Sequence, residues 1–315
     1  MLASMGRTLE GTYMHMLDVY LHEPELSRAK SGEMNLFNRI CDALSGWEVC
    51  YHRLDLDGPV PRRPGYSLWW MVTPPVAHGL TLRRAYWFPF WRVERTNDRW
   101  NFDVARKTFP VGDIDSDAAK DFCRKLRNRI MPGFSRTSRE GFLFIPLQGK
   151  LREHRSFQSM SPIDMIKETL ARDSRPLRAT LHPKETYEAE DISALEALAR
   201  RFPRFALDTR SSELLLASCD AIVTQNSVLA LSGALIGKPS ILFAKIDFHH
   251  VFGSVPRDGV ENAFHASQAS ESMLERYLFW LLQIEALNAG HPDFGARLLD
   301  RLGALGWPVE KRTAY

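Results

Sequence analysis

Residues 219–243 read CDAIVTQNSVLALSGALIGKPSILF, and they predict a strand, a helix and a second strand in direct succession. Residues 221–223 and 240–243 are short apolar runs of the length expected of buried strands. Residues 228–236 between them are predicted to be a helix, which ends where a Gly-Lys-Pro sequence follows. A strand, a helix and a strand in this order are typical of a parallel sheet, because parallel neighbours need a crossover connection.

The same alternation extends back along the chain to residue 142. The predicted strands are 142–147, 178–181 and 205–207, and the predicted helices are 162–171, 192–202 and 212–218. Strands that alternate with helices favour an α/β fold with a parallel sheet covered on both faces. In such sheets ligands bind beyond the carboxyl ends of the strands, so a site is expected in the residues that follow each strand.

The first half of the chain is richer in tryptophan than the second half. Five of the eight tryptophans lie between Trp69 and Trp100, and a role in the core is expected for them because tryptophan buries a large apolar area. The elements predicted here are helices at 35–44 and 117–130 and strands at 47–51, 67–72 and 85–93. A polar, turn-rich linker at 131–140 predicts a domain boundary, and a long apolar helix is predicted at 272–287.

Composition and charge exclude several classes of protein. A chain of 315 residues that is 44% hydrophobic and 25% charged is typical of a globular protein, and its length suggests two domains. A net charge of +3 is too small for the clustered basic face of a nucleic-acid-binding protein. No apolar run is long enough for a signal peptide or a membrane span, so a soluble, cytoplasmic protein is expected.

The sequence predicts no metal site. The four cysteines lack the spacing of a zinc or redox motif. Asp55 and Asp57 form an Asp-x-Asp pattern, as do Asp113 and Asp115, but such patterns are expected by chance among 38 acidic residues. His249-His250 is a candidate ligand pair, yet neighbouring side chains on a strand face opposite ways.

Polar and cationic side chains follow three of the predicted strands. Gln148 begins the first of these segments, His182-Pro183-Lys184 forms the second and Thr224-Gln225-Asn226-Ser227 the third. The third segment opens a helix, whose first backbone N–H groups are unpaired and attract phosphate. The alternative for Asn226 and Ser227 is that they only cap this helix, and the alternative for His182 is a structural role.

These elements, in this order, resemble the capsule polysaccharide biosynthesis and export family, which includes bacterial Kdo transferases. The resemblance is carried by Gln148 at a strand end, a His-x-Ser element at 154–156, the His-Pro pair, a Ser-Ser-x-x-Leu-Leu helix from Ser211 and residues 219–243. It implies a GT-B architecture, in which two Rossmann-like domains face each other across a cleft. The C-terminal domain would bind the nucleotide sugar, which for the Kdo transferases is a CMP-sugar.

The resemblance also implies roles for individual residues. His182 and Ser227 would hold the nucleotide phosphate, and Ser211 and Ser212 would shape the ribose or base side of the donor site. The other donor-site residues that it implies are Gln148, Pro183, Lys184, Thr224, Gln225 and Asn226.

One departure from the family leaves the catalytic residue open. Relatives often carry an acidic residue shortly after the glutamine, whereas here four other residues precede Glu153. Either Glu153 takes that role, or the catalytic carboxylate lies in the N-terminal domain, or the activity is altered. Asp98, Asp103 and Glu94 are the candidates in that domain, because an inverting transfer needs a base near the acceptor hydroxyl, and His182 is a further catalytic candidate.

The leading expectation is a metal-independent glycosyltransferase that moves an acidic, Kdo-like sugar from CMP to a capsular or surface polysaccharide. Its ligand would be CMP-Kdo, and no further cofactor is expected. Its partner would be the capsule assembly machinery at the inner face of the membrane, and no nucleic acid partner is expected. The implied domains are an acceptor side at 1–138, a nucleotide-sugar-binding domain at 139–270, and helices at 271–315 that pack back toward the first domain. Two alternatives stay open: a non-catalytic glycan-binding or export-assembly protein of the same fold, and a transferase with another nucleotide sugar.

Overall fold

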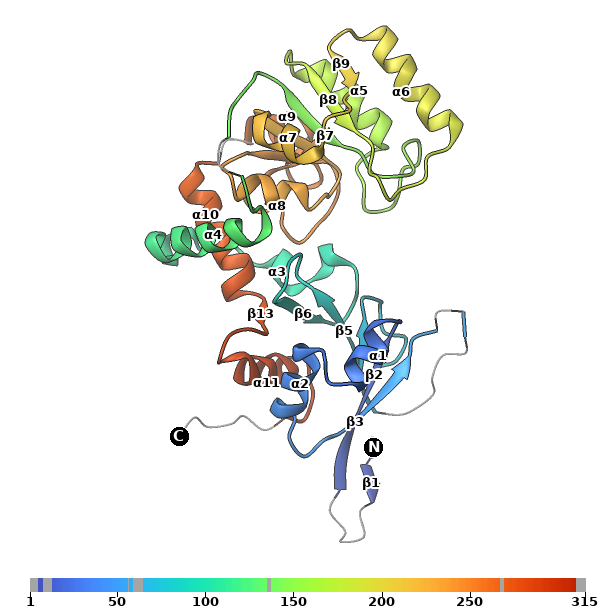
Figure 1. Cartoon of the computed structure of the whole chain (residues 1–315), viewed down its shortest axis with the longest axis vertical. Helices are drawn as coiled ribbons and strands as arrows, with labels where there is room; N and C mark the ends of the chain where they lie inside the picture. The colour runs from blue at the N-terminus through green and yellow to red at the C-terminus, as the bar shows by residue number, and fades with distance from the viewer. Residues whose placement is uncertain are drawn as a thin grey trace. The chain divides into compact units, whose positions relative to one another are not determined.

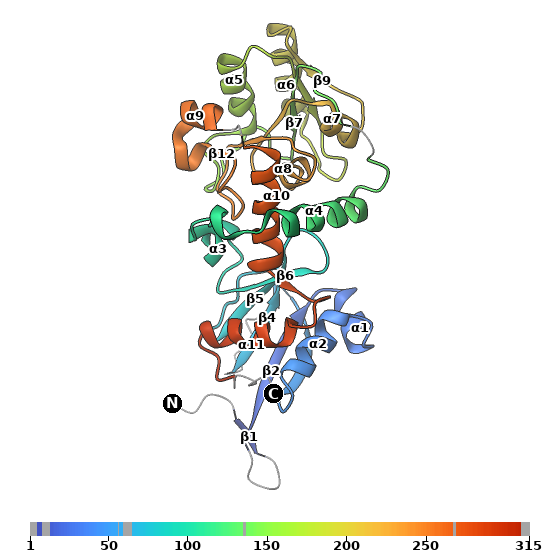
Figure 2. The same cartoon turned by 90° about the vertical axis from the view of Figure 1, so that its left-hand side faces the viewer.

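The computed structural model describes residues 5–7, 13–55, 57–58, 65–134, 137–266 and 269–309, and in it the chain forms two compact units (Figure 1; Figure 2). Unit 1 contains Met1–Arg106 and Leu282–Tyr315, and unit 2 contains Lys107–Leu281. These limits differ from the boundaries predicted after residues 138 and 270. Residues 135 and 136 of the predicted linker lie outside the described residues, and the roles given to the predicted domains stay predictions.

Unit 2 is built on a parallel sheet with the strand order β12-β11-β10-β7-β8-β9. The strands are β7 (Leu143–Pro146), β8 (Leu177–Thr180), β9 (Phe205–Leu207), β10 (Ala221–Thr224), β11 (Ser240–Leu242) and β12 (Gly253–Ser254). The helices between and after them are α5 (Pro162–Arg172), α6 (Ala189–Arg201), α7 (Ser212–Ser218), α8 (Leu229–Ala234) and α9 (Val255–Ala266). The predicted alternation of strands and helices is therefore confirmed, and each strand predicted between residues 142 and 243 is present within one residue of its predicted ends.

Both faces of this sheet are covered, because its strands send apolar side chains alternately to either side. Leu143 and Ile145 of β7 pack with apolar residues of α5, α6 and α9. Phe144, which lies between them, packs with Leu215 and Leu216 of α7 on the other face. The strands are continuous apolar runs for this reason, as in other parallel sheets that are buried on both sides.

Two further helices belong to unit 2, α4 (Ser116–Ile130) and α10 (Glu271–Phe279), and the short 3-10 turn η2 (Val111–Asp113) precedes α4. The carboxylate of Asp115 caps the start of α4. The two helices pack through Phe122 and Phe279, whose ring centroids lie 5.5 Å apart in an edge-to-face arrangement. This packing explains why α4 joins unit 2 and not the segment before it. None of the helices in the described part of the chain has the length and apolar character needed to cross a bilayer.

Unit 1 is built on a mixed sheet in which β3 and β4 flank β2, and β5, β6 and β13 continue outward from β4. The strands are β1 (Met5–Arg7), β2 (Tyr13–Leu21), β3 (Glu48–Arg53), β4 (Tyr66–Trp70), β5 (Gly79–Arg84), β6 (Phe90–Glu94) and β13 (Leu287–Asn288). β2, β3, β4 and β5 run parallel, while β1, β6 and β13 are antiparallel to their neighbours. The strand predicted at 85–93 is wrong over its first half, because residues 85–89 form the turn between β5 and β6, closed by a hydrogen bond from the N–H of Ala85 to the carbonyl of Phe90.

The helices of unit 1 are α1 (Glu25–Lys30), α2 (Asn35–Ala43), α3 (Asp103–Arg106) and α11 (Phe294–Ala304), with the 3-10 turn η1 (Arg99–Asn101). Leu17 and Val19 of β2 pack with apolar residues of α1, α2 and α11 in one core. Trp70 and Trp91 are buried in the same core, which confirms the role expected of these tryptophans. Asp18 lies between Leu17 and Val19 on the strand and therefore faces the other side of the sheet.

The helix predicted at 272–287 is wrong in its second half. α10 ends at Phe279, a π-helical turn (η3, Trp280–Ile284) follows, and the chain then enters strand β13. Leu287 of β13 pairs with Trp91 of β6 and is buried in the core of unit 1. The apolar pattern therefore reaches Leu287 because the sheet of unit 1, and not a helix, buries this residue.

Candidate functional site

The polar strand ends predicted from the sequence lie side by side in unit 2. β7 is hydrogen-bonded to β10 on one side and to β8 on the other, and all three strands are parallel. Gln148, His182 and Asn226 therefore follow neighbouring strands at the same, carboxyl edge of the sheet. The connections also change direction here, since the chain runs outward from β7 to β9 and then returns to β10. Open α/β sheets bind their ligands at such a switch point, beyond the carboxyl ends of the strands.

His182 is exposed after β8, and Tyr187 fixes its loop. The backbone N–H of His182 donates a 2.7 Å hydrogen bond to the Tyr187 hydroxyl, which donates in turn to the carbonyl of Leu147 at 3.4 Å. Burial raises the pKa of Tyr187, so this hydroxyl stays protonated and able to donate. The N–H of Lys184 donates to Nδ1 of His182 at 3.2 Å, so a neutral imidazole carries its proton on Nε2. His182 thus presents an Nε2–H donor on an exposed side chain, next to the exposed Pro183 and Lys184.

The loop after β7 is held by its own charged side chains. Arg152 pairs with Glu188 at 2.7 Å and with Asp191 at 3.1 Å, both at the start of α6. These hydrogen bonds, chiefly the one to Asp191, raise the pKa of the Arg152 guanidinium. Lys150 and Glu153 pair at 3.1 Å, and both are exposed. The charges of Lys150, Arg152 and Glu153 are therefore neutralised by neighbouring residues, and the catalytic role predicted for Glu153 stays a prediction.

Three of the four side chains from Thr224, the last residue of β10, to Ser227 are buried. Thr224, Gln225 and Ser227 are 1%, 4% and 7% exposed, and Gln225 donates from Nε2 to a backbone carbonyl at 3.1 Å. The N–H of Ser227 donates to Oγ1 of Thr224 at 3.4 Å, and the N–H of Leu229, the first residue of α8, donates to Oγ of Ser227 at 3.3 Å. Ser227 therefore has the contact expected of a cap. Asn226 is only half-buried and its amide has no hydrogen-bond partner among the described residues, which makes it the side chain of this loop most available to a ligand.

The Ser-Ser pair at the start of α7 lies beside the end of β8. The hydroxyl of Ser211 accepts a 3.3 Å hydrogen bond from the N–H of Leu214 and so caps α7. The hydroxyl of Ser212 lies 3.2 Å from that of Thr180, the last residue of β8. Ser212 is therefore close in the fold to the His182 loop, whereas the hydroxyl of Ser211 is used by its own helix.

Two of the three carboxylates of unit 1 that are candidate catalytic bases pair with one arginine. The guanidinium of Arg301 donates to Glu94 at 2.6 Å and to Asp103 at 2.5 Å, so one cation holds both. Burial raises the pKa of Glu94, although the charge of Arg301 acts to lower it. The carboxylate of Asp98 is exposed and pairs with no side chain in the described part of the chain. Glu94 and Asp103 thus each form an ion pair with Arg301 that has a structural role. A catalytic role for Glu94, Asp98 or Asp103 stays a prediction.

His249 and His250 line a cavity of about 780 Å³ in unit 2, together with the first turn of α10. Nδ1 of His250 lies 3.0 Å from the hydroxyl of Tyr277, and its Nε2 lies 3.1 Å from the carbonyl of Lys107. The ring also stacks on that of His249 at a centroid distance of 4.3 Å. Both nitrogens of His250 are therefore occupied. Across the residues that the structure describes, no three His, Cys, Asp or Glu side chains converge as metal ligands would.

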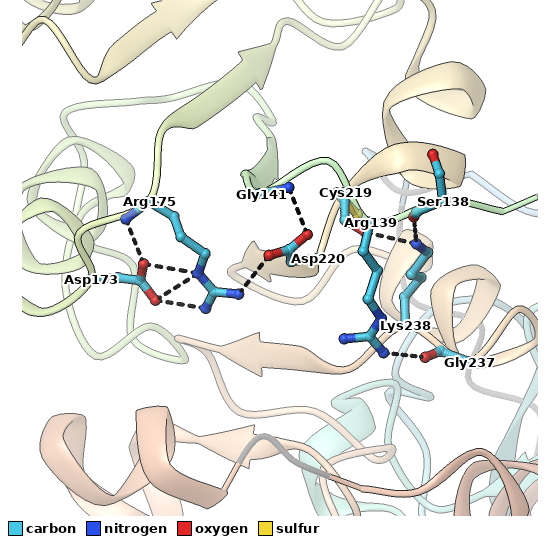
Figure 3. A network of polar contacts seen from close by, with 9 residues as sticks. All are labelled: Ser138, Arg139, Gly141, Asp173, Arg175, Cys219, Asp220, Gly237 and Lys238. Carbon is cyan, nitrogen blue, oxygen red and sulfur yellow. Dashed lines mark hydrogen bonds and ion pairs between the residues drawn. The ribbon is translucent and has the colours of Figure 1, made fainter.

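At the opposite edge of the sheet in unit 2, where the strands begin (the amino edge), charged side chains hydrogen-bond and pair with neighbouring segments (Figure 3). Lys238 is 2% exposed, and its Nζ donates to the carbonyl of Cys219 at 2.7 Å and to that of Ser138. Burial lowers the pKa of Lys238. In the same view Arg175 pairs with Asp220 at 3.2 Å (Figure 3). These polar groups hold the segments that enter the strands, so the amino edge is a structural network.

The structure also brings together a polar pair in unit 1 that sequence reasoning does not single out. Nε2 of His52 on β3 lies 2.6 Å from Oδ1 of Asp18 on β2, although the two residues are 34 positions apart in the chain. The signal in the sequence is one aspartate inside the apolar run MLDVYL at 16–21. A lone acidic residue in a buried strand needs a partner, but the sequence does not say which residue provides it.

Comparisons with known proteins identify the fold. No family model and no curated protein matches the chain. A solved structure of KpsC from Thermosulfurimonas dismutans, a beta Kdo 2,7 transferase, is similar over 93% of this chain and 100% of that chain, with a TM-score of 0.51 and 12% identity. The chain has the GT-B fold. The α/β class with two Rossmann-like domains that the sequence predicts is thereby confirmed, while the predicted placement of the domains across a cleft stays a prediction.

Two other solved structures show weaker similarity. A second KpsC structure from T. dismutans, a beta Kdo 2,4 transferase, covers 82% of this chain and 89% of that chain with a TM-score of 0.42 and 14% identity. A complex of MnaA from S. aureus with UDP covers 96% of this chain and 100% of that chain with a TM-score of 0.38 and 12% identity.

Proposed function

We propose that the chain is a glycosyltransferase that moves an acidic, Kdo-like sugar from a CMP-sugar to a capsular or surface polysaccharide. The observation that carries the proposal is the carboxyl edge of unit 2, where Gln148, His182 and Asn226 follow adjacent strands at the switch point of a parallel sheet. Two things support it: a Kdo transferase structure shares the fold, and residues 219–243 resemble the capsule polysaccharide family. The capsule assembly machinery at the inner face of the membrane is the partner that this proposal includes.

The charges at this edge support a donor that contains phosphate. In the loop after β7, Arg152 and Lys150 are already paired with carboxylates, whereas Arg155 is half-buried and its Nε has no hydrogen-bond partner among the described residues. Lys184 is exposed, and its ammonium group has no partner among the described residues. One lysine, the Nε2–H of His182 and the amide of Asn226 suit one phosphodiester, as in a CMP-sugar.

In the proposed reaction the bond between the anomeric carbon and the phosphate oxygen breaks, and CMP leaves with the electron pair. The acceptor oxygen forms the new bond to that carbon and loses its proton. Negative charge grows on the departing phosphate, and donors that are already in place stabilise this charge as it develops. The proposal gives this task to His182 and Asn226 and assigns no metal.

A thermal-shift panel tests the donor site. The melting temperature is measured with CMP, UDP, GDP and ADP at equal concentration, and CMP is expected to raise it most. A ligand that binds only the folded state stabilises it by about 2.7 kcal/mol at a hundredfold excess over Kd. A larger shift with UDP or GDP would move the proposal to another donor class, and the absence of any shift would refute a nucleotide site.

Turnover separates an enzyme from a glycan-binding protein of the same fold. Release of CMP from CMP-Kdo is measured with and without a Kdo-terminated oligosaccharide as acceptor. Release that depends on both the protein and the acceptor supports the transferase. Binding of CMP without such release would favour the non-catalytic alternative.

A further inference from the structure

Asp18 and His52 form a carboxylate–imidazole pair in the sheet of unit 1. Nε2 of His52 lies 2.6 Å from Oδ1 of Asp18. β2 and β3 run parallel, and Asp18 is in register with Cys50, two residues before His52. The Asp18 side chain is 8% exposed, whereas that of His52 is 25% exposed. The pair therefore has a buried carboxylate at one end and an imidazole that reaches solvent at the other.

Two aromatic rings fix the orientation of this imidazole. The His52 ring stacks on Tyr20 with centroids 5.0 Å apart and 26° between the planes, and Tyr20 stacks on Trp69 at 4.1 Å and 16°. Nε1 of Trp69 donates a 2.8 Å hydrogen bond to the hydroxyl of Ser67, which fixes the far end of the stack. Tyr20 is in register with both His52 and Trp69, so the three rings lie toward the carboxyl ends of adjacent parallel strands.

The hydrogen bond to Asp18 determines what the other nitrogen of His52 can do. A neutral imidazole that donates from Nε2 to a carboxylate carries a lone pair on Nδ1. In the part of the chain that the structure describes, no hydrogen-bond partner lies at Nδ1 of His52. An imidazole whose outer nitrogen accepts a proton while a buried carboxylate orients the inner one is the arrangement of a general base. Ligands of α/β sheets bind at the same edge, beyond the carboxyl ends of parallel strands.

Stability alone is a weak reason for this pair. The loss of hydration of a buried carboxylate offsets most of its attraction to a charged partner, and well-packed apolar side chains in the same place are often as stable. Met16 and Tyr20 flank Asp18 on its own face of the strand, and Met16 is half-buried while Tyr20 is buried. A carboxylate between them is better explained by the imidazole that it orients.

We propose that His52 is the base that takes the proton from the acceptor hydroxyl, and that Asp18 positions it. This inference rests on the proposed transferase and on the acceptor role predicted for the first domain, and it adds the group that activates the acceptor. The acceptor O–H bond breaks, its proton goes to Nδ1 of His52, and its oxygen bonds to the anomeric carbon as CMP leaves with the electron pair. The resulting imidazolium is stabilised by the carboxylate of Asp18. The proton must leave the acceptor oxygen whether the anomeric configuration is inverted or retained.

The first test compares two substitutions with a matched control. His52→Gln should lower kcat about 100- to 10,000-fold, which is the usual contribution of a general base. Asp18→Asn should lower kcat about 10- to 100-fold, as loss of the residue that orients a functional histidine usually does. Both variants should bind CMP as the native protein does. His78→Gln is the control, because His78 is an exposed histidine of the same unit. A kcat for His52→Gln within about threefold of the native value would overturn the inference.

Chemical rescue separates catalysis from folding. His52→Ala removes the ring and leaves space beside Tyr20, so free imidazole added to the assay can replace the base. Imidazole should restore transfer by His52→Ala in proportion to its concentration and should not affect the His78→Gln control. If both His52 variants lose activity, keep the native melting temperature and are not rescued, His52 is not the base.

A third measurement needs no donor turnover. The ring signals of His52 are followed by NMR while the methyl glycoside of Kdo is added to the native protein. The sugar should shift the His52 signals and leave those of His78 in place. Unchanged His52 signals at saturating sugar would refute the inference, whatever the nucleotide panel shows. A shift at His52 without any nucleotide response would instead refute the donor proposal and leave the sugar contact standing.

Discussion

Asn226→Asp tests the proposed phosphate site with a change of one charge and almost no change of shape. Asn226 is the half-buried side chain of the loop after β10, and its amide has no hydrogen-bond partner among the described residues. The substitution therefore removes no known contact, and its effect on stability should stay within about 0.5 kcal/mol. Ser227 is less suitable for such a test because it is 7% exposed, so a new carboxylate there would be buried and would disturb folding.

The expected loss of affinity follows from the distance between the charges. If the amide of Asn226 donates to the phosphate, the new carboxylate would lie about 5 Å from the phosphate charge. Two like charges at that distance repel by about 3 kcal/mol at a dielectric constant of 20 and by about 1 kcal/mol in water. Asn226 is half-buried, so the true value should lie between these limits. The variant should therefore bind CMP about 10- to 100-fold more weakly than the native protein.

Calorimetric titration with CMP at two salt concentrations measures this effect. The difference between native and variant should shrink in high salt, because ions screen an exposed pair of charges. Asn128→Asp is the matched control, since Asn128 is exposed on α4 in the same unit and undergoes the same change of charge. If Asn226→Asp binds CMP as tightly as Asn128→Asp at low salt, the phosphate does not bind at this loop and the reasoning fails.

Four further outcomes are expected. His182→Ala should lower kcat/KM about 10- to 100-fold, because it removes a hydrogen bond to the charged phosphate of the donor. The melting temperature should not change because the side chain is exposed, and steady-state kinetics with CMP-Kdo measures the loss. EDTA should leave CMP release unchanged, and activity that is lost and then restored by magnesium would contradict this. Lys238→Met should lower the free energy of unfolding by about 1–3 kcal/mol in urea titrations, because it leaves the buried carbonyl of Cys219 without this donor and removes a partly buried hydrogen bond to Ser138. Burial raises the pKa of Glu94, so the folded state binds the proton of the Glu94 carboxyl more tightly than the unfolded state does. The free energy of unfolding of the native protein, measured relative to that of Glu94→Gln, should therefore fall as pH rises from about 4 to 7.

The sheet of unit 2 was predictable because its signals are local. Each strand is a short apolar run between turn residues, and each crossover helix follows directly in the chain. The failures concern pairings between distant segments. Leu287 belongs to a strand because Trp91 pairs with it, and no periodicity within 272–287 reveals that contact. α9 was not predicted, and Gly259 with a φ of 74° interrupts its helical pattern.

The candidate site was predictable to the level of the strand ends. The rule that ligands bind at the carboxyl ends of parallel strands selects the loops that contain Gln148, His182 and Asn226. It does not reveal that Thr224 and Ser227 are buried, because their burial depends on packing around the loop. The pairing of Asp18 with His52 depends on the register of two strands, which a single sequence does not fix.

Unit 1 is assembled from two segments of chain with all of unit 2 between them. Leu287 supplies a strand next to β6, α11 completes the core with α2, and Arg301 neutralises Glu94. During synthesis the residues up to 106 therefore leave the ribosome without these partners, and the part of their core that α11 and β13 cover stays exposed while unit 2 is made. Unit 2 is continuous in the chain and can fold as soon as it emerges. We therefore expect the incomplete first unit to be exposed to aggregation until α11 has been synthesised and packs on it.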